Sequence, residues 1–367
     1  MAKIGSRQQL SGKEQAITYR VCSLLLGTPT MNATQVAERV NDEFGEEILT
    51  REQVYPRIVK GVEQNLVRFV PPRNSTLKGS VASTYNLSGD AIQVIDVESK
   101  GEDEGSLQWA GDQVAAAGAE YVFELIDDVW NSKPTNDRSN DYVRIGLGPG
   151  RATLSFCRHL SLLLRSSANS PPIQLIAISA GCAANHPEYA STSFFGLFPR
   201  GDKCDFLGLF AETLVPAHEL SEIFTRPGIK EAHAIRNRID IVVTSLGVQE
   251  DEHDLLRHFL TDAGCPLPKD CVGNLQYRPY TKTEPFLEKD NNLRAVTLFE
   301  IKDFVEMAQK KNRHVVLLAR QCAACGMSRA AALYPLMKTE CLRAWSHIVM
   351  DVKTAQELLE RADRTGK

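Results

Sequence analysis

The sequence predicts a small winged helix-turn-helix domain over residues 1–75, followed by an α/β domain with a doubly wound, mostly parallel sheet over residues 107–367. Two observations predict this fold class. Residues 30–70 contain two short helical patterns separated by a polar turn, as in a helix-turn-helix. Residues 140–352 alternate apolar, strand-like runs with amphipathic stretches, and glycines stand at several strand ends.

Composition agrees with a globular chain of more than one domain. Of the 367 residues, 43% are hydrophobic and 24% are charged, and no apolar run approaches the length of about 20 residues that spans a membrane. No secretory signal is visible, so we expect a cytoplasmic protein whose nine scattered cysteines stay reduced. Residues 1–79 carry 11 basic and 8 acidic residues although the whole chain has a net charge of −4, which favours localised phosphate contact.

Three helices and a short strand are expected in the first domain. Asn32 and Thr50 are expected as N-caps, since their side chains can accept hydrogen bonds from the first-turn amides. Pro71-Pro72 ends the strand and predicts the start of a wing. The expected elements are Leu10–Leu26, Thr34–Val40, Thr50–Gln64 and Leu66–Val70.

Residues 76–106 are expected to form a linker, because their alternation is weak and Glu98–Gly105 is charged and contains glycine. Ser106 is expected to cap a helix with a stripe of small and apolar residues from Leu107 to Val129. This stripe either packs on the domain core or forms a dimer seam.

Six buried strands are expected beyond this helix. Most are continuously apolar, as strands of a parallel sheet are, and ligands of such sheets bind beyond the carboxyl ends of the strands. The expected strands are Tyr142–Leu147, Ile173–Ser179, Gly208–Leu214, Ile239–Leu246, His314–Ala319 and His347–Asp351.

The strongest candidate site is the glycine loop after the first of these strands. Gly148 and Gly150 would let the backbone approach an anion at the start of a helix, while Arg151 adds charge and Thr153 a hydroxyl group. The loop lacks a complete phosphate-binding signature, so a plain tight turn between strand and helix is the alternative.

Two later strand ends repeat this pattern. Gly247 follows the strand Ile239–Leu246, and Gly326 and Arg329 follow the strand that ends at Ala319. If these loops meet at one edge of the sheet, Arg329 could pair with a phosphate or carboxylate; the alternative is a solvated helix residue.

Two patterns could indicate chemistry of another kind. Cys322-x-x-Cys325 has the spacing of half a zinc site, but no second pair is present, so we expect no metal and no other cofactor. Asp251–Asp254, which includes His253, could be an acid/base cluster or the first turn of a helix, where carboxylates are favoured. With no nucleophile motif, we expect no catalytic residues.

In the helix-turn-helix pattern, the start of the second helix is the part that meets DNA bases. Arg51, Gln53, Tyr55 and Arg57 are the exposed candidates for contacting double-stranded operator DNA, while Val54 and Ile58 face inward. The alternative is a winged-helix adaptor that binds protein.

The chain resembles the SorC-type sugar-binding transcriptional regulators over most of its length. Each motif that carries the resemblance is short, but their order and spacing are fairly specific. They are Leu49-Thr50-Arg51 to Leu66-Val67, the stripe from Leu107 to Trp130, Gly148–Leu154, Val215-Pro216, Asp240–Gly247, Val272-Gly273-Asn274, and Cys325-Gly326 with Arg329-Ala330-x-Ala332.

The resemblance implies an effector domain similar to sugar isomerases that binds a small carbohydrate or sugar phosphate, has no isomerase activity, and assembles as a homodimer or homotetramer. The alternative is a sugar-phosphate isomerase. The chain departs from the family at several points: an extra residue near Ala152, an insertion around Arg320–Ala324, Pro56 in the second helix of the motif, Asn274 for aspartate, Cys325 for glycine and Arg329 for lysine.

Overall fold

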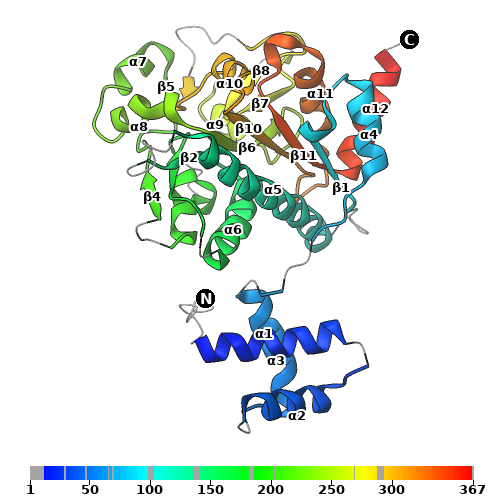
Figure 1. Cartoon of the computed structure of the whole chain (residues 1–367). Helices are drawn as coiled ribbons and strands as arrows, with labels where there is room; N and C mark the ends of the chain where they lie inside the picture. The colour runs from blue at the N-terminus through cyan, green and yellow to red at the C-terminus, as the bar shows by residue number, and fades with distance from the viewer. Residues whose placement is uncertain are drawn as a thin grey trace. The chain divides into compact units, whose positions relative to one another are not determined.

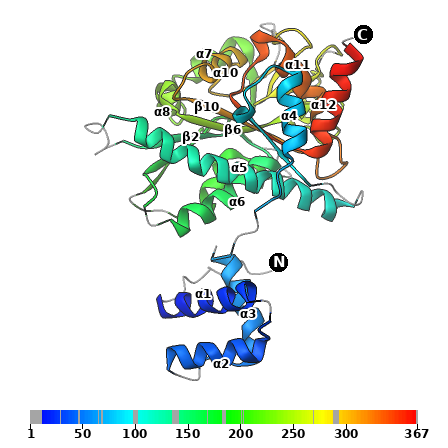
Figure 2. The same ribbon diagram turned by 45° about the vertical axis from the view of Figure 1, so that its right-hand side comes forward.

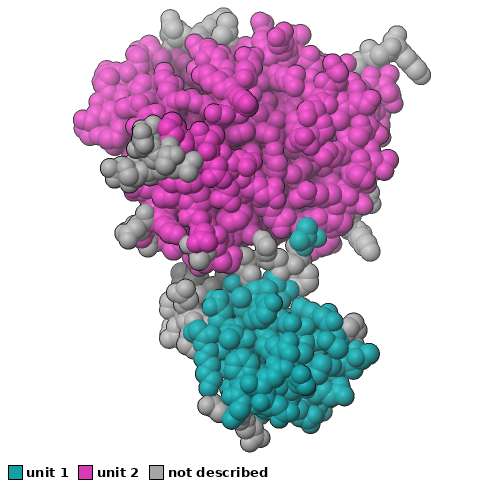
Figure 3. Space-filling model, in the orientation of Figure 1, with its two compact units in different colours: residues 1–70 teal, residues 71–367 magenta. Residues whose placement is uncertain are grey.

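The protein is described here by a computed structural model, which is divided into two compact units, Met1–Val70 and Pro71–Lys367 (Figure 3). The residues that the structure describes are 12–28, 30–45, 48–64, 66–67, 70–97, 103–134, 141–167, 169–181, 186–199, 201, 203–267, 269–286 and 293–365.

The first unit is a three-helix domain (Figure 1). Asn32 caps the second helix as expected, because its side chain accepts a hydrogen bond from the Gln35 amide. Asn41 fixes the turn that follows, since its Oδ1 accepts from Leu49 N at 2.9 Å and its Nδ2 donates to Leu49 O at 2.9 Å. The helices are α1 Gly12–Gly27, α2 Ala33–Phe44 and α3 Arg51–Glu63.

The expected wing strand Leu66–Val70 lies in part outside the described residues. Its described members are not in a strand. The chain instead enters the second unit at Pro71, where Pro72 O accepts a hydrogen bond from Asp96 N at 2.8 Å.

A mixed sheet forms the centre of the second unit. In the described residues it has nine strands, with the order β1-β11-β10-β6-β2-β3-β4, and all neighbours along this path are parallel. The strands of the path are β1 Ile92–Ile95, β2 Val143–Leu147, β3 Ile173–Ala177, β4 Cys204–Leu207, β6 Ile241–Val248, β10 His314–Ala319 and β11 His347–Asp351.

Short antiparallel strands complete this unit. The hairpin of β7 Gly273–Leu275 and β8 Arg278–Tyr280 pairs with the end of β6, and β5 Leu214–Pro216 pairs with β9 Leu293–Ala295. The hairpin therefore extends the sheet at the carboxyl end of β6.

Helices cover both faces of the sheet, which confirms the doubly wound α/β fold (Figures 1 and 2). The helices α5 Glu104–Ser132 and α6 Arg151–Ser166 pack together on one face. The other face carries α4 Ser75–Thr84, α10 Ile301–Ala308, α11 Ala330–Lys338 and α12 Val352–Thr365. The described residues of this unit also form the helices α7 Leu220–Ile223, α8 Lys230–Ile235 and α9 Leu255–Asp262.

The stripe on α5 packs on the sheet and belongs to the core, so these residues do not form a dimer seam. At Gly118 the helix approaches the sheet so closely that an added Cβ would lie 2.5 Å from Leu318 Cδ2. Asp103, rather than Ser106, caps this helix by accepting the Ser106 amide at 3.0 Å.

Two expectations about the second unit are wrong. Residues 76–97 are not a linker, because they contain most of α4 and the strand β1, which pairs in register with β11; residues 98–102 lie outside the described part. The strand expected at Gly208–Leu214 is β4, which ends at Leu207; as an edge strand it is only half buried and lacks a continuous apolar pattern.

None of the helices in the described residues combines the length and apolar character that crossing a bilayer requires.

Candidate functional site

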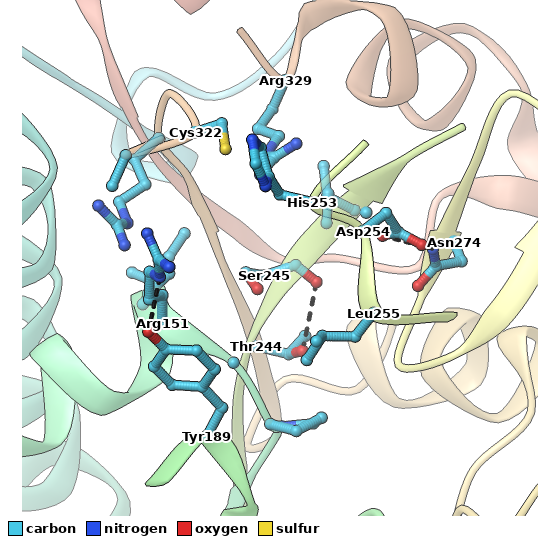
Figure 4. A pocket seen from close by; sticks show the side chains of 18 of the residues that line it. Arg151, Tyr189, Thr244, Ser245, His253, Asp254, Leu255, Asn274, Cys322 and Arg329 are labelled. Carbon is cyan, nitrogen blue, oxygen red and sulfur yellow. Dashed lines mark hydrogen bonds between the residues drawn. The ribbon is translucent and has the colours of Figure 1, made fainter. Parts of the chain in front are cut away.

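A cavity lies at the carboxyl ends of the central strands, where the strand order reverses. β3 and β4 lie on one side of β2, whereas β6, β10 and β11 lie on the other. The loops after β2 and β6 therefore diverge, and the crevice between such loops is where open α/β sheets bind ligands. The cavity encloses about 180 Å³ and is lined by the loops after β2, β6 and β10 and by the β7–β8 turn (Figure 4).

The loop after β2 brings the start of α6 to this cavity. Gly150 is the N-cap, with φ 109°, and no side chain caps the helix. The first-turn amides of a helix have no acceptor within it and favour an anion. Next to them, Arg151 Nε donates to the Tyr189 hydroxyl at 2.8 Å, and its guanidinium lies 5.3 Å from the centre of the Tyr189 ring. Tyr189 thus holds a cation beside the helix N-terminus.

Arg329 reaches the cavity from the start of α11 and pairs with Asp251. Its Nη1 donates to Asp251 Oδ2 at 2.7 Å, and the carboxylate is buried. Burial by itself raises the pKa of Asp251, but the facing guanidinium of Arg329 and the hydrogen bond from the His253 amide together outweigh burial, so the pKa is below that of an ordinary aspartate. Asp251 therefore neutralises part of the charge that Arg329 brings to the cavity.

Arg320, which follows β10, is a third arginine at the cavity and was missed by the sequence reasoning. The residue is only 4% exposed, and its Nη1 has no hydrogen-bond partner among the described residues. Burial lowers its pKa to about 10, although Asp112 favours its charged form. The side chain lies against Gly111 of α5, where an added Cβ would come 1.9 Å from Nη1. A buried cation with an unused donor provides a binding partner for an anion.

The opposite wall is built around Asp254. This side chain caps α9 by accepting the Arg257 amide at 2.9 Å, and it also accepts the side-chain amide of Asn274 at 3.0 Å. Gly247 is needed here, because an added Cβ would lie 2.0 Å from Asp254 Oδ2. Burial raises the pKa of Asp254. Of the two interpretations of Asp251–Asp254, the start of a helix is the one that the structure supports for Asp254.

The β7–β8 turn faces the cavity with a strained backbone. Gln276 and Tyr277 have φ values of 54° and 60°, which are uncommon for residues with a side chain. The buried amide of Gln276 holds the turn in place, since it donates to Thr244 Oγ1 at 2.7 Å and accepts from the Ser179 hydroxyl. Strain retained in this way is common at binding sites.

The structure brings some of the expected effector-binding residues together and not others. Gly150, Arg151, Gly247 and Arg329 line the cavity. The other three do not: Gly148 packs against Gln276 and Thr244, Thr153 is buried with its hydroxyl unpaired among the described residues, and Gly326 lies against Leu107.

The expected DNA-contacting residues lie on α3 of the first unit. Arg51, Gln53 and Tyr55 are exposed, and Gln53 Oε1 also accepts from Thr50 N at 3.0 Å. Arg57 is not exposed as expected: its side chain is 13% exposed and pairs with Glu14 at 3.2 Å. It therefore ties α3 to α1.

The described residues thus form a small three-helix unit and a doubly wound α/β unit with a cavity at its switch point. No protein-family model and no curated protein matches the chain. The full-length sorbitol operon regulator SorC of Klebsiella pneumoniae is similar in structure, with a TM-score of 0.58 and 14% identity, over 96% of this chain and 100% of that chain.

A DeoR family transcriptional regulator from Listeria monocytogenes has a TM-score of 0.52 and 15% identity, over 78% of this chain and 100% of that chain. At these identities the similarity establishes the fold. The chain has the fold of the SorC-type regulators, as the resemblance in its sequence predicted.

Proposed function

We propose that the protein is a DNA-binding transcriptional regulator whose α/β unit senses a small anionic carbohydrate of the sugar-phosphate class. The observation that carries this proposal is the convergence of Arg151, Arg320 and Arg329 with the uncapped N-terminus of α6 on one cavity. The same chain carries the three-helix unit with an exposed α3. Regulators of known structure combine such parts over the length of this chain.

The enzymatic alternative has less support. A sugar-phosphate isomerase needs an acid or base, and the two buried carboxylates are engaged, Asp254 as a helix cap and Asp251 with Arg329; this leaves histidines such as His253 and His258 as candidates for that role. Turnover of a sugar phosphate by the purified protein would support the enzyme instead.

We also propose that the protein acts as a homodimer or homotetramer, because one helix-turn-helix reads few base pairs and paired half-sites need paired subunits. Light scattering at micromolar concentration tests this proposal, and a strict monomer would contradict it.

We expect Arg51→Ala to weaken binding to duplex DNA. Arg51 is exposed at the first residue of α3, where such helices meet DNA. Loss of one phosphate contact lowers the slope of log affinity against log salt by about 0.9, whereas loss of a base contact costs about 1–3 kcal/mol. Fluorescence anisotropy with labelled genomic fragments at several salt concentrations measures both quantities.

The matched control is Arg364→Ala, since Arg364 is an exposed arginine on α12 of the second unit. This variant should keep the wild-type affinity and salt dependence. If the wild-type protein has no salt-dependent affinity for the fragments, the proposed binding to DNA is wrong, and the adaptor alternative gains support.

We expect a sugar phosphate to raise the thermal stability of the wild-type protein but not of the Arg151→Gln variant. A ligand at 100 times its dissociation constant stabilises the folded state by about 2.7 kcal/mol. Arg151 stands beside the uncapped helix N-terminus, so its loss removes a charge from the anion site. A thermal-shift screen with hexose and pentose phosphates, each paired with the unphosphorylated sugar, measures the effect.

Arg158→Gln is the matched control, because Arg158 is exposed on the same helix and does not line the cavity. Its thermal shift should equal that of the wild type. Equal shifts in the Arg151→Gln variant, or no shift with any sugar phosphate, would rule out the proposed anion site.

A further inference from the structure

Two cysteines share one side of the loop that follows β10. Gly326, with φ 69°, turns the chain directly after Cys325. Backbone hydrogen bonds close the loop, from Gly326 N to Cys322 O at 2.9 Å and from Cys322 N to Met327 O at 2.8 Å. The turn brings Cys322 close enough to Cys325 for the two thiols to influence each other.

Two further metal-binding side chains face this pair from the segment between β6 and α9. Cys325 Sγ lies 3.6 Å from Asp251 Oδ1. The donor atoms of Asp251, His253 and Cys325 all lie within 4.8 Å of one another. Cys322 is also close to Asp251 but lies outside this group of three donors. The fold therefore brings an aspartate and a histidine to Cys325, with Cys322 on the same loop.

We propose that Cys322, Cys325, His253 and Asp251 bind one divalent metal ion of the zinc class at the rim of the cavity. Two sulfur donors, one nitrogen and one oxygen make a four-ligand set, and thiolates select zinc over magnesium or calcium. In a tetrahedral zinc site the donor atoms lie about 3.3–3.8 Å apart. The separation of 3.6 Å between Asp251 Oδ1 and Cys325 Sγ meets this requirement, whereas Cys322 Sγ, which lies outside the group of three, has to move closer when the ion binds.

Arg329 completes the site from outside the ligand shell. It donates to Asp251 Oδ2, so Oδ1 remains directed at the cysteines, where the His253 amide also holds it at 2.9 Å. Two thiolates and a carboxylate exceed the charge of a divalent ion by one, and the guanidinium of Arg329 compensates for this excess. The metal site thus shares Asp251 and Arg329 with the wall of the cavity.

The test is cobalt and zinc titration of the full-length, reduced, metal-free protein. We expect one Co²⁺ per chain, with the near-ultraviolet charge-transfer absorption of a cobalt–thiolate bond, and displacement by one equivalent of Zn²⁺. The double variant Cys322→Ser/Cys325→Ser should lose this absorption. Cys265→Ser is the matched control, because Cys265 is an exposed cysteine outside the cluster and should leave the titration unchanged.

His253→Ala keeps the test decisive if the serine variants fold poorly, because His253 is exposed. It should weaken zinc affinity by more than about tenfold with an unchanged circular dichroism spectrum. Absence of metal binding by the reduced wild-type protein, or equal zinc binding by the double variant, would overturn the proposal. These measurements need neither DNA nor a sugar phosphate, so their outcome is independent of the proposed function.

Discussion

Replacing Arg320 with methionine is expected to abolish binding of an anionic effector and, in the same variant, to stabilise the ligand-free protein. The arginine is almost completely buried, and burial lowers its pKa to about 10, which corresponds to a cost on the order of 3 kcal/mol for keeping the charge in the folded state. Methionine fills a similar volume without a charge, so the replacement removes this cost of burying the guanidinium.

Both effects can be measured in the full-length protein with probes that report on the second unit. The three tryptophans of the chain, Trp109, Trp130 and Trp345, all lie in it, so urea unfolding followed by their fluorescence reports the stability of that unit. Calorimetric titration with the panel of sugar phosphates reports binding.

Arg158→Met is the control for Arg320→Met, because it removes an exposed arginine that does not line the cavity. It should change neither quantity by more than about 0.5 kcal/mol. An Arg320→Met protein that retains wild-type affinity would show that the anion lies elsewhere. A less stable one would show that Arg320 has structural partners that outweigh its burial.

Lys133→Met is expected to lower the free energy of unfolding by about 3–5 kcal/mol without changing the affinity for the effector, in contrast to Arg320→Met. Lys133 follows α5 at the edge of the sheet away from the cavity, where its Nζ donates to Asp141 at 3.0 Å, to Asp240 at 3.1 Å and to Tyr142 O at 2.7 Å. The variant leaves two partly buried carboxylates without this cation.

The pH dependence of stability should change in the same variant. Burial raises the pKa of Asp141, but hydrogen bonds from Lys133, from the Tyr142 backbone and from Arg144 outweigh burial and lower the pKa to about 2. Because the folded-state pKa lies below the ordinary value of 3.8, this carboxylate stabilises the fold above about pH 4 and loses its contribution as the pH falls toward 2. Removing Lys133 raises the pKa and moves acid unfolding to higher pH.

Urea unfolding at neutral pH and acid titration by circular dichroism measure these changes. The exposed Lys310 gives the matched control, Lys310→Met, which should behave as the wild type. A loss below about 1 kcal/mol for Lys133→Met would mean that the pairs act as surface ion pairs rather than as part of the sheet scaffold.

Helix caps and buried strands could be predicted from the sequence, because they depend on residues that are close together in the chain. Asn32 was expected as a cap because its own side chain reaches the amide of Gln35, and the central strands were expected because burial on both faces demands apolar runs. The edge strand β4 is only half buried, has no such demand and was displaced by several residues. β1 is buried, but its four residues are too few to show a pattern, so it was taken for part of a linker.

The rest depends on contacts between distant segments. The β7–β8 turn was not predicted because Gln276 and Tyr277 adopt left-handed backbone angles without the glycine or asparagine that usually signals such a turn. Arg320 was treated as part of an insertion, since its role depends on Gly111, some 200 residues earlier. The position of Arg57 in the sequence likewise predicts that it lies on the exposed face of α3, but its ion pair with Glu14 of α1 leaves most of its side chain buried.

The strand that was taken for a linker has a consequence for communication. Gln321, on the cavity wall, donates its backbone N–H to Asp351 Oδ2 at 2.7 Å. Asp351 is in register with Ile95 of β1. The residue after Ile95, Asp96, donates its backbone N–H to Pro72 O, two residues beyond the first unit. If the cavity binds an effector and the first unit binds DNA, these few contacts connect the two events. Thermodynamic linkage is reciprocal, so the factor by which an effector changes operator affinity is the factor by which the operator changes effector affinity.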